Sequence, residues 1–175
     1  MTAVLSLYNA SVPGLIRMMD NLEHILRKGE ADAAERGIDP SVFLGASLAP
    51  DMATLAKQVQ IGTAIAKACP FRIAGLKPPV YDDIESPSFA DLYALLDKTR
   101  KDVNSVTRAQ IDGREEVEFN VKMGPQERSF TGISYCSGFT VPNVYFHITT
   151  AYNILRHNGV PLGKLDFFGG PSAIG

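Results

Sequence analysis

Histidine is the side chain with the widest chemical scope in this chain, and two of its three histidines lie in one segment. Residues 142–159 are typical of a helix that begins at Pro142 and ends at Asn158-Gly159. His147 lies in the middle of this segment, among apolar and aromatic residues. A buried imidazole can bind a metal, transfer a proton, or be a polar group satisfied by a neighbour. The spacing of the other polar residues has to distinguish these roles.

The spacing of the histidines argues against a metal site made by this helix alone. His147 and His157 are ten residues apart, which places them on different faces and roughly 15 Å apart along a helix axis. They therefore cannot bind one metal ion, and His157 is better placed to interact with the helix dipole. The chain has no His pair at i, i+4 and no Glu-x-x-His pattern, so neither a zinc site nor a di-iron site is indicated.

Other catalytic patterns are absent from the sequence. It contains no GxSxG, P-loop or GxGxxG motif. Cys69 and Cys136 are far apart and have no CxxC partner, which predicts two reduced cysteines packed as small apolar residues. A Cys136–His147 pair is conceivable, but no orienting acid is apparent beside it.

Helical periodicity predicts the elements that would position these residues. Apolar residues recur at helical spacing in four long segments, 12–36, 52–74, 88–109 and 143–157, with a short helical turn at 41–45. Ser11 is expected to cap the first of these helices, and Ser88 with Asp91 forms a capping box at the third. Pro70 predicts a kink or an early end of the second helix, and residues 75–87 form a linker.

The period changes to two between the third and fourth long helices. Residues 117–123 alternate apolar with polar side chains, Gly124-Pro125 predicts a turn, and residues 128–131 can return as a second strand. Residues 133–140 then form a helical approach that Pro142 interrupts. The predicted fold is mainly α: one domain over residues 1–175, a four-helix bundle with a small β-hairpin inserted before the last long helix.

Composition limits the classes of partner. Apolar residues make up 45% of the chain, charged residues 21%, and the net charge is −2, so a clustered basic surface for nucleic acid is not expected. No apolar run is long enough for a membrane span, and no signal peptide is evident, so we expect a cytoplasmic protein. The apolar residues of the tail 160–175 are expected to dock on the bundle or on a partner chain; they are Leu162, Leu165, Phe167 and Phe168.

Three motifs resemble a known group of proteins. They are the opening Leu5 to Pro13, the segment Ala49-Pro-Asp-Met52 with Gln58-Val-Gln60, and the segment His147 to Gly163, which contains Ile-Leu-Arg156 and Gly159-Val-Pro161. Together they resemble an uncharacterised bacterial family of unknown function within the DinB/YfiT-like putative metalloenzyme superfamily. The resemblance spans nearly the whole chain and implies a DinB-like four-helix bundle.

The resemblance also implies where a metal would lie. In that superfamily, one histidine of the second helix and a His-x-x-x-His pair of the last helix bind the metal. The pair falls on Asn143 and His147, and the second-helix ligand falls on Gln58 or Gln60. Amide oxygens are poor zinc or nickel ligands compared with imidazole, so a hydrogen-bonded polar cluster or an altered small-molecule pocket replaces the metal site in this interpretation.

We therefore expect a non-enzymatic or small-ligand-binding homodimer with a degenerate metal site and no cofactor. Its expected ligand-binding residues are Gln58, Gln60, Asn143, His147 and Tyr152. The alternative is a transferase or hydrolase that uses His147 to bind a divalent metal, zinc, nickel or iron, with Asn143 and Gln58 or Gln60.

Overall fold

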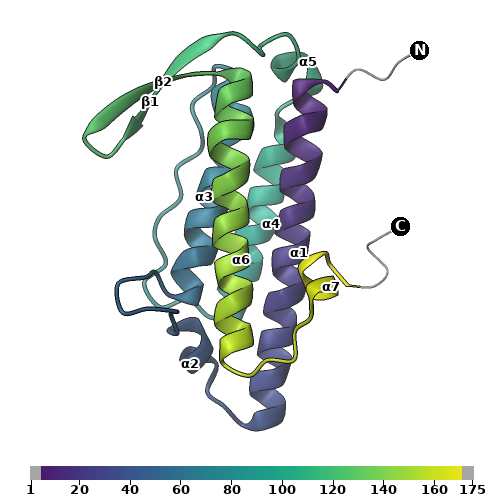
Figure 1. Cartoon of the computed structure of the whole chain (residues 1–175), viewed down its shortest axis with the longest axis vertical. Helices are drawn as coiled ribbons and strands as arrows, with labels where there is room; N and C mark the ends of the chain where they lie inside the picture. Colours follow the sequence, from purple (N-terminus) through teal and green to yellow (C-terminus); the bar gives the residue numbers. More distant parts are fainter. Residues whose placement is uncertain (1–4, 171–175) are drawn as a thin grey trace.

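Four long helices run side by side and form the body of the protein in a computed structural model that describes residues 5–170 (Figure 1). They are α1 (Leu7–Arg36), α3 (Leu55–Ile73), α4 (Phe89–Ser105) and α6 (Val141–His157). Helix α3 contacts α4 and α6, and α1 contacts the same two helices, so the four surround one core. The predicted four-helix bundle is confirmed. The expected domain of residues 1–175 includes residues 1–4 and 171–175, which lie outside the described part.

The first helix begins earlier than its sequence predicts. Ser6 is the N-cap, and its side chain accepts a hydrogen bond from the Asn9 amide at 3.3 Å. Ser11, the predicted cap, is buried inside the helix, where its hydroxyl donates to the Leu7 carbonyl at 2.7 Å. Burial of Leu7 against the core extends the helix by more than a turn beyond the segment that the capping pattern indicated.

The second and third long helices largely follow their predicted limits. Pro70 lies within α3, which continues to Ile73, so the helix does not end early at Pro70, one of the two outcomes expected there. Ser88 and Asp91 form the predicted capping box of α4. The third predicted helix is divided, because Val106 is extended and the short helix α5 (Arg108–Ile111) follows as a separate element. Helix α2 (Pro40–Leu44) is the predicted turn, capped by Asp39.

The segment between α3 and α4 has no regular secondary structure and is fastened to the bundle by side chains. Lys57 binds Asp83 at 2.8 Å, and the Tyr81 hydroxyl donates to Asp102. The Tyr81 ring also covers the ammonium group of Lys67, which lies 3.2 Å from the ring centroid. Burial lowers the pKa of Lys67 to about 8. This crossover is thus held to the bundle at Tyr81 and Asp83.

The predicted hairpin forms and projects from one end of the bundle, with its turn away from the helices (Figure 1). Strands β1 (Glu118–Met123) and β2 (Gln126–Thr131) are antiparallel, with Phe119 opposite Phe130. Tyr135, fully buried, contacts both rings at centroid distances of 5.3 and 5.2 Å, and Arg72 donates to its hydroxyl. An isolated two-stranded hairpin is marginal, so this aromatic contact explains how the insertion is stabilised.

The predicted helical approach to α6 is a π-helix, η1 (Ser134–Thr140), and α6 follows it directly. Pro142 lies in the first turn of α6, where its missing N–H is tolerated. At the other end of the chain, α7 (Lys164–Phe167) packs against α1. Within residues 5–170, no helix combines the length and the apolar character needed to cross a lipid bilayer.

Candidate functional site

The face between α3 and α6 carries His147, and a glycine determines how closely the two helices approach there. A methyl group on Gly62 would lie 3.3 Å from the Cβ atom of His147. Glycine therefore allows His147 to lie directly over α3, one turn from Gln58. The helix–helix contact, rather than a loop, positions this imidazole.

Gln58 and His147 form one hydrogen-bonded unit. The Nδ1 atom of His147 lies 2.7 Å from Oε1 of Gln58, and Nε2 of Gln58 donates to the Ala53 carbonyl at 3.1 Å. Gln58 is buried and His147 is half-buried. Since the main chain before α3 fixes the orientation of the amide, its oxygen is the atom presented to the imidazole.

This arrangement determines the state of the imidazole. An amide oxygen only accepts hydrogen bonds, so Nδ1 of His147 carries a proton and Nε2 has a lone pair when the ring is neutral. Burial lowers the pKa of His147 below its usual value, which favours the neutral ring. Among the described residues, Nε2 has no hydrogen-bond partner. The site therefore presents one oriented acceptor.

Asn143 shares the α6 face with His147 but makes a different contact. Its amide Nδ2 donates to the Phe139 carbonyl at 2.8 Å, one turn back in η1. The side chain thus satisfies a carbonyl at the junction of η1 with α6. It makes no hydrogen bond to Gln58 or His147 among the described residues.

Gln60 and Tyr152 lie away from the Gln58–His147 pair. Gln60 exchanges two hydrogen bonds with the main chain of Ile84, at 3.1 and 2.9 Å, and so holds the α3–α4 crossover. The Tyr152 hydroxyl reaches the Leu162 carbonyl at 3.5 Å, and its ring lies edge-on to Phe167. Of the five residues proposed from the sequence, the structure joins Gln58 to His147 by a direct hydrogen bond.

Comparisons with known proteins show which family the chain belongs to. A family model described as "Domain of unknown function (DUF1993)" matches residues 7–168. The chain belongs to the DUF1993 family. Its fold is similar to the crystal structure of a DinB family member protein from Shewanella denitrificans, with 34% sequence identity and a TM-score of 0.86. That match covers 94% of this chain and 92% of the other. No curated protein gave a significant match.

The match to a DinB family member identifies this DUF1993 protein as DinB-like and confirms the resemblance seen in its motifs. The superfamily's metal site can therefore be tested against the residues present. Gln58 uses its oxygen to accept from His147, and Asn143 turns its amide towards Phe139. Within residues 5–170, no three His, Cys, Asp or Glu side chains cluster in a way that could hold a metal ion. The side chains at the superfamily's ligand positions do not fit a transition metal.

The remaining histidines of this DUF1993 protein have other surroundings. His24 binds Asp166 at 3.0 Å, and Lys28 binds the same carboxylate at 2.9 Å, so this cluster fastens the α7 segment to α1. Three hydrogen bonds, from His24, Lys28 and the Gly163 amide, lower the pKa of Asp166 to about 2 although burial opposes the shift. His157 is exposed in the last turn of α6.

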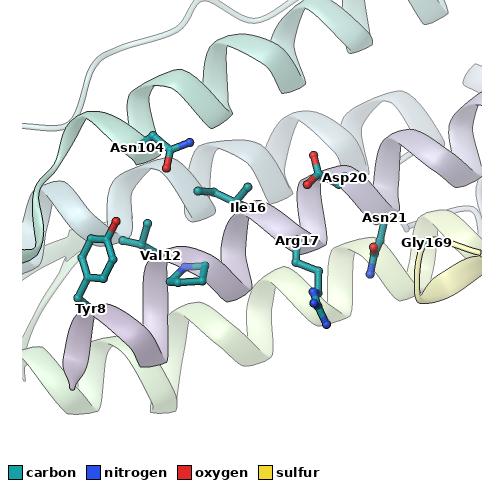
Figure 2. A pocket seen from close by; sticks show the side chains of 9 residues that line it. Tyr8, Val12, Ile16, Arg17, Asp20, Asn21, Asn104 and Gly169 are labelled. Atoms are coloured by element: carbon teal, nitrogen blue, oxygen red, sulfur yellow. The ribbon is translucent and has the colours of Figure 1, made fainter. Parts of the chain in front are cut away.

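A surface groove follows α1 on another side of the bundle (Figure 2). Its volume is about 610 Å³, and Asn104 of α4 and Gly169 of the C-terminal segment contribute to its walls. Figure 2 shows that the residues along the groove come mainly from α1; they are Tyr8, Val12, Ile16, Arg17, Asp20 and Asn21. None of the residues proposed from the sequence lines this groove.

One pair of reactive side chains was missed by sequence reasoning. Cys69 of α3 and Cys136 of η1 lie against each other, and both are buried free thiols. Cys136 therefore lies against a cysteine, and its hydrogen bond goes to the Ala10 carbonyl rather than to His147. The sequence spacing of the two cysteines did not indicate their contact, because they lie in separate elements whose packing depends on the whole core.

Proposed function

We propose that this DUF1993 protein is a non-enzymatic homodimer that binds a small ligand through the Nε2 atom of His147. The observation that carries the proposal is the 2.7 Å hydrogen bond between Gln58 and His147. It orients a neutral imidazole and leaves one lone pair for a partner, as a recognition site needs. The same bond occupies the oxygen that a metal at this position would require.

The surroundings of His147 favour an organic ligand with a hydrogen-bond donor. The Phe146 ring lies edge-on to the imidazole, with 5.4 Å between centroids, and Phe146 is 56% exposed. Tyr145, the preceding residue, is 47% exposed. An acceptor beside exposed aromatic rings suits a ligand with an apolar body and a hydroxyl, amide or ammonium donor.

A matched pair of histidine variants tests ligand binding. We expect fragments that carry such donors to bind the native protein in ligand-observed NMR and to lose binding in His147→Gln. His157→Gln removes an exposed histidine from the same helix and should leave binding unchanged. Equal binding to the native protein and His147→Gln, or no binding of any fragment in a broad donor-bearing panel, would contradict the proposal.

The exposed apolar side chains of the C-terminal segment support the homodimer. Leu165 is 50% exposed and Phe168 is 40% exposed, although Phe167 beside them packs on Tyr152. The groove along α1 adjoins them at Gly169. In a two-fold dimer, these apolar side chains of one copy can pack into the groove along α1 of the other copy, and the reverse contact forms at the same time.

Light scattering after size exclusion tests the dimer. The native protein should elute with the mass of two chains, and Leu165→Ser combined with Phe168→Ser should shift it to one chain. Val42→Ser, at another exposed apolar residue, is the matched control and should remain dimeric. A native monomer, or a double variant that keeps the dimer, would refute this part of the proposal.

A further inference from the structure

The Cys69–Cys136 pair lies where α3 and η1 pack against each other in the core. Cys69 lies on α3 and is fully buried, and Cys136 lies in η1 with 2% exposure. The two thiols lie against each other, and the Cys136 thiol donates a hydrogen bond to the Ala10 carbonyl of α1 at 3.8 Å. Both sulfur atoms are therefore held by the packing of three elements.

The two thiols are chemically unequal. Contact with Cys136 raises the pKa of Cys69, and burial raises it further. Contact with Cys69 lowers the pKa of Cys136. Cys136 is therefore the more easily deprotonated of the two.

An apolar pocket leads to one thiol only. Its volume is about 280 Å³, Cys136 forms part of its wall, and Cys69 does not. Most of the other lining residues are aliphatic, and the polar ones are Glu115 and Ser137; the aliphatic residues are Leu5, Leu7, Ala10, Ile133 and Val141. A small molecule with an alkyl group fits this lining, while a large charged thiol such as a peptide does not.

The secondary structure at Cys136 also differs from that of the rest of the bundle. Cys136 lies in the π-helix η1, and its carbonyl accepts the hydrogen bond of the Val141 amide. Insertions of this kind occur frequently at functional sites because they displace side chains from the regular helical positions. Here the displaced residue is placed between a pocket and a second thiol.

We propose that Cys136 and Cys69 form a dithiol that reacts with a small organic hydroperoxide entering through this pocket. This inference is independent of the His147 site. It assigns Cys136 as the residue attacked first and Cys69 as the residue that completes a disulfide between η1 and α3.

The chemistry balances in two steps. The Cys136 sulfur attacks the terminal oxygen of the hydroperoxide, the O–O bond breaks, and the thiol proton goes to the departing alkoxide, which leaves as an alcohol. Cys69 then attacks the sulfenic sulfur, the S–S bond forms, and the hydroxyl group leaves with the Cys69 proton as water. The two thiols lose two electrons in total, and the hydroperoxide gains them.

Mass spectrometry of the intact protein treated with tert-butyl hydroperoxide tests the proposal. The native protein should lose the mass of two hydrogens, and a non-reduced digest should yield a Cys69–Cys136 linked peptide. Cys69→Ser should gain the mass of one oxygen on Cys136, trapped by dimedone. Cys136→Ser should remain unmodified at Cys69, because Cys69 does not line the pocket.

A further pair of variants tests entry through the pocket. Ala10 lines it, so Ala10→Phe should suppress the reaction, whereas Ala34→Phe, at an exposed site near the other end of α1, should react like the native protein. Circular dichroism checks that each variant is folded. No disulfide in the native protein, equal oxidation of Cys69 in Cys136→Ser, or an unchanged rate in Ala10→Phe would each overturn the proposal.

Discussion

The hydrogen bond between Gln58 and His147 couples a buried amide to a half-buried imidazole. The amide oxygen of Gln58 only accepts hydrogen bonds, so Nδ1 of His147 must carry a proton. Burial lowers the pKa of the ring, so a second proton on Nε2 is disfavoured. The hydrogen bond to Gln58 and the burial of the ring together favour a neutral His147 with its proton on Nδ1. A metal-binding histidine pair would not provide the hydrogen bond to an amide oxygen.

The lowered pKa of His147 predicts a pH dependence of stability. Its pKa is lower in the folded protein than the roughly 6.5 of an unperturbed histidine, so the unfolded chain binds more protons in the window between the two values. The resulting stability is fully present above that unfolded value and is lost as pH falls through the folded pKa. We expect His147→Gln to flatten this part of the profile.

Urea unfolding of the native protein and His147→Gln between pH 7 and pH 5 measures this component as the difference between two profiles. Asn143→Ala, at a polar residue of the same helix that does not titrate, is the control and should keep the native pH dependence in this window. Profiles that stay parallel for the native protein and His147→Gln would show that the imidazole is not held neutral by the fold.

The residues of the candidate site were only partly predictable from the sequence. Gln58 and Gln60 are two positions apart on one helix, and both flank its apolar stripe, so periodicity could not tell which one faces α6. The choice depends on Gly62, which admits His147, and on Ile84, whose main chain binds Gln60. Both contacts are long-range, and no local pattern contains them.

At the scale of elements, two glycines allow α6 to pack closely on its neighbours. Gly62 faces His147 on the α3 side, and Gly29 of α1 faces Leu155, where an added methyl group would lie 2.8 Å from a leucine Cδ atom. Leu155 is fully buried, so it has little room to change rotamer. The position of α6, and with it His147, is therefore sensitive to small side chains on α1 and α3.

Two glycine substitutions on the same helix should have opposite effects. Gly29→Ala should lower the free energy of unfolding by about 1–3 kcal/mol, because Leu155 must move in a packed core. Gly14→Ala, exposed on α1 with no atom within 4 Å of the new methyl group, should raise it by about 0.5–1 kcal/mol. Chemical denaturation measures both, and a stabilising Gly29→Ala would contradict the close packing of α1 on α6.

The elements were predicted well where they depend on local signals. The Ser88–Asp91 capping box and the alternation in residues 118–123 were confirmed, since a cap and a half-buried strand leave direct traces in the sequence. The start of α1 at Leu7, capped by Ser6, and the π-helix η1 were not predicted. Each of these depends on tertiary burial that overrides a local preference.

At the scale of the whole molecule, the four-helix bundle with an inserted hairpin followed from the number and period of the segments, and the DinB-like resemblance is confirmed by the family match. The pairing of Cys69 with Cys136 shows what such reasoning omits. Residues far apart in sequence meet only when helix order, rotation and the η1 insertion are all fixed. The fold could be predicted from the sequence, but the contact between Cys69 and Cys136 could not.

The central claim is that an amide–imidazole pair stands where related bundles would bind a metal. Replacing the two amides at the superfamily's ligand positions by imidazoles, Gln58→His with Asn143→His, should restore an N-donor set beside His147. Gln60→His is the matched control, because Gln60 faces the Ile84 main chain instead.

Zinc titration monitored through the imidazole nitrogen signals of His147 tests this claim most directly. We predict that the native protein and Gln60→His keep the Nδ1–H form and retain no stoichiometric zinc after dialysis, whereas the double variant binds zinc with a shift of the His147 signals. Stoichiometric zinc on the native protein, lost in His147→Gln, would contradict the account and favour a metal-dependent transferase or hydrolase.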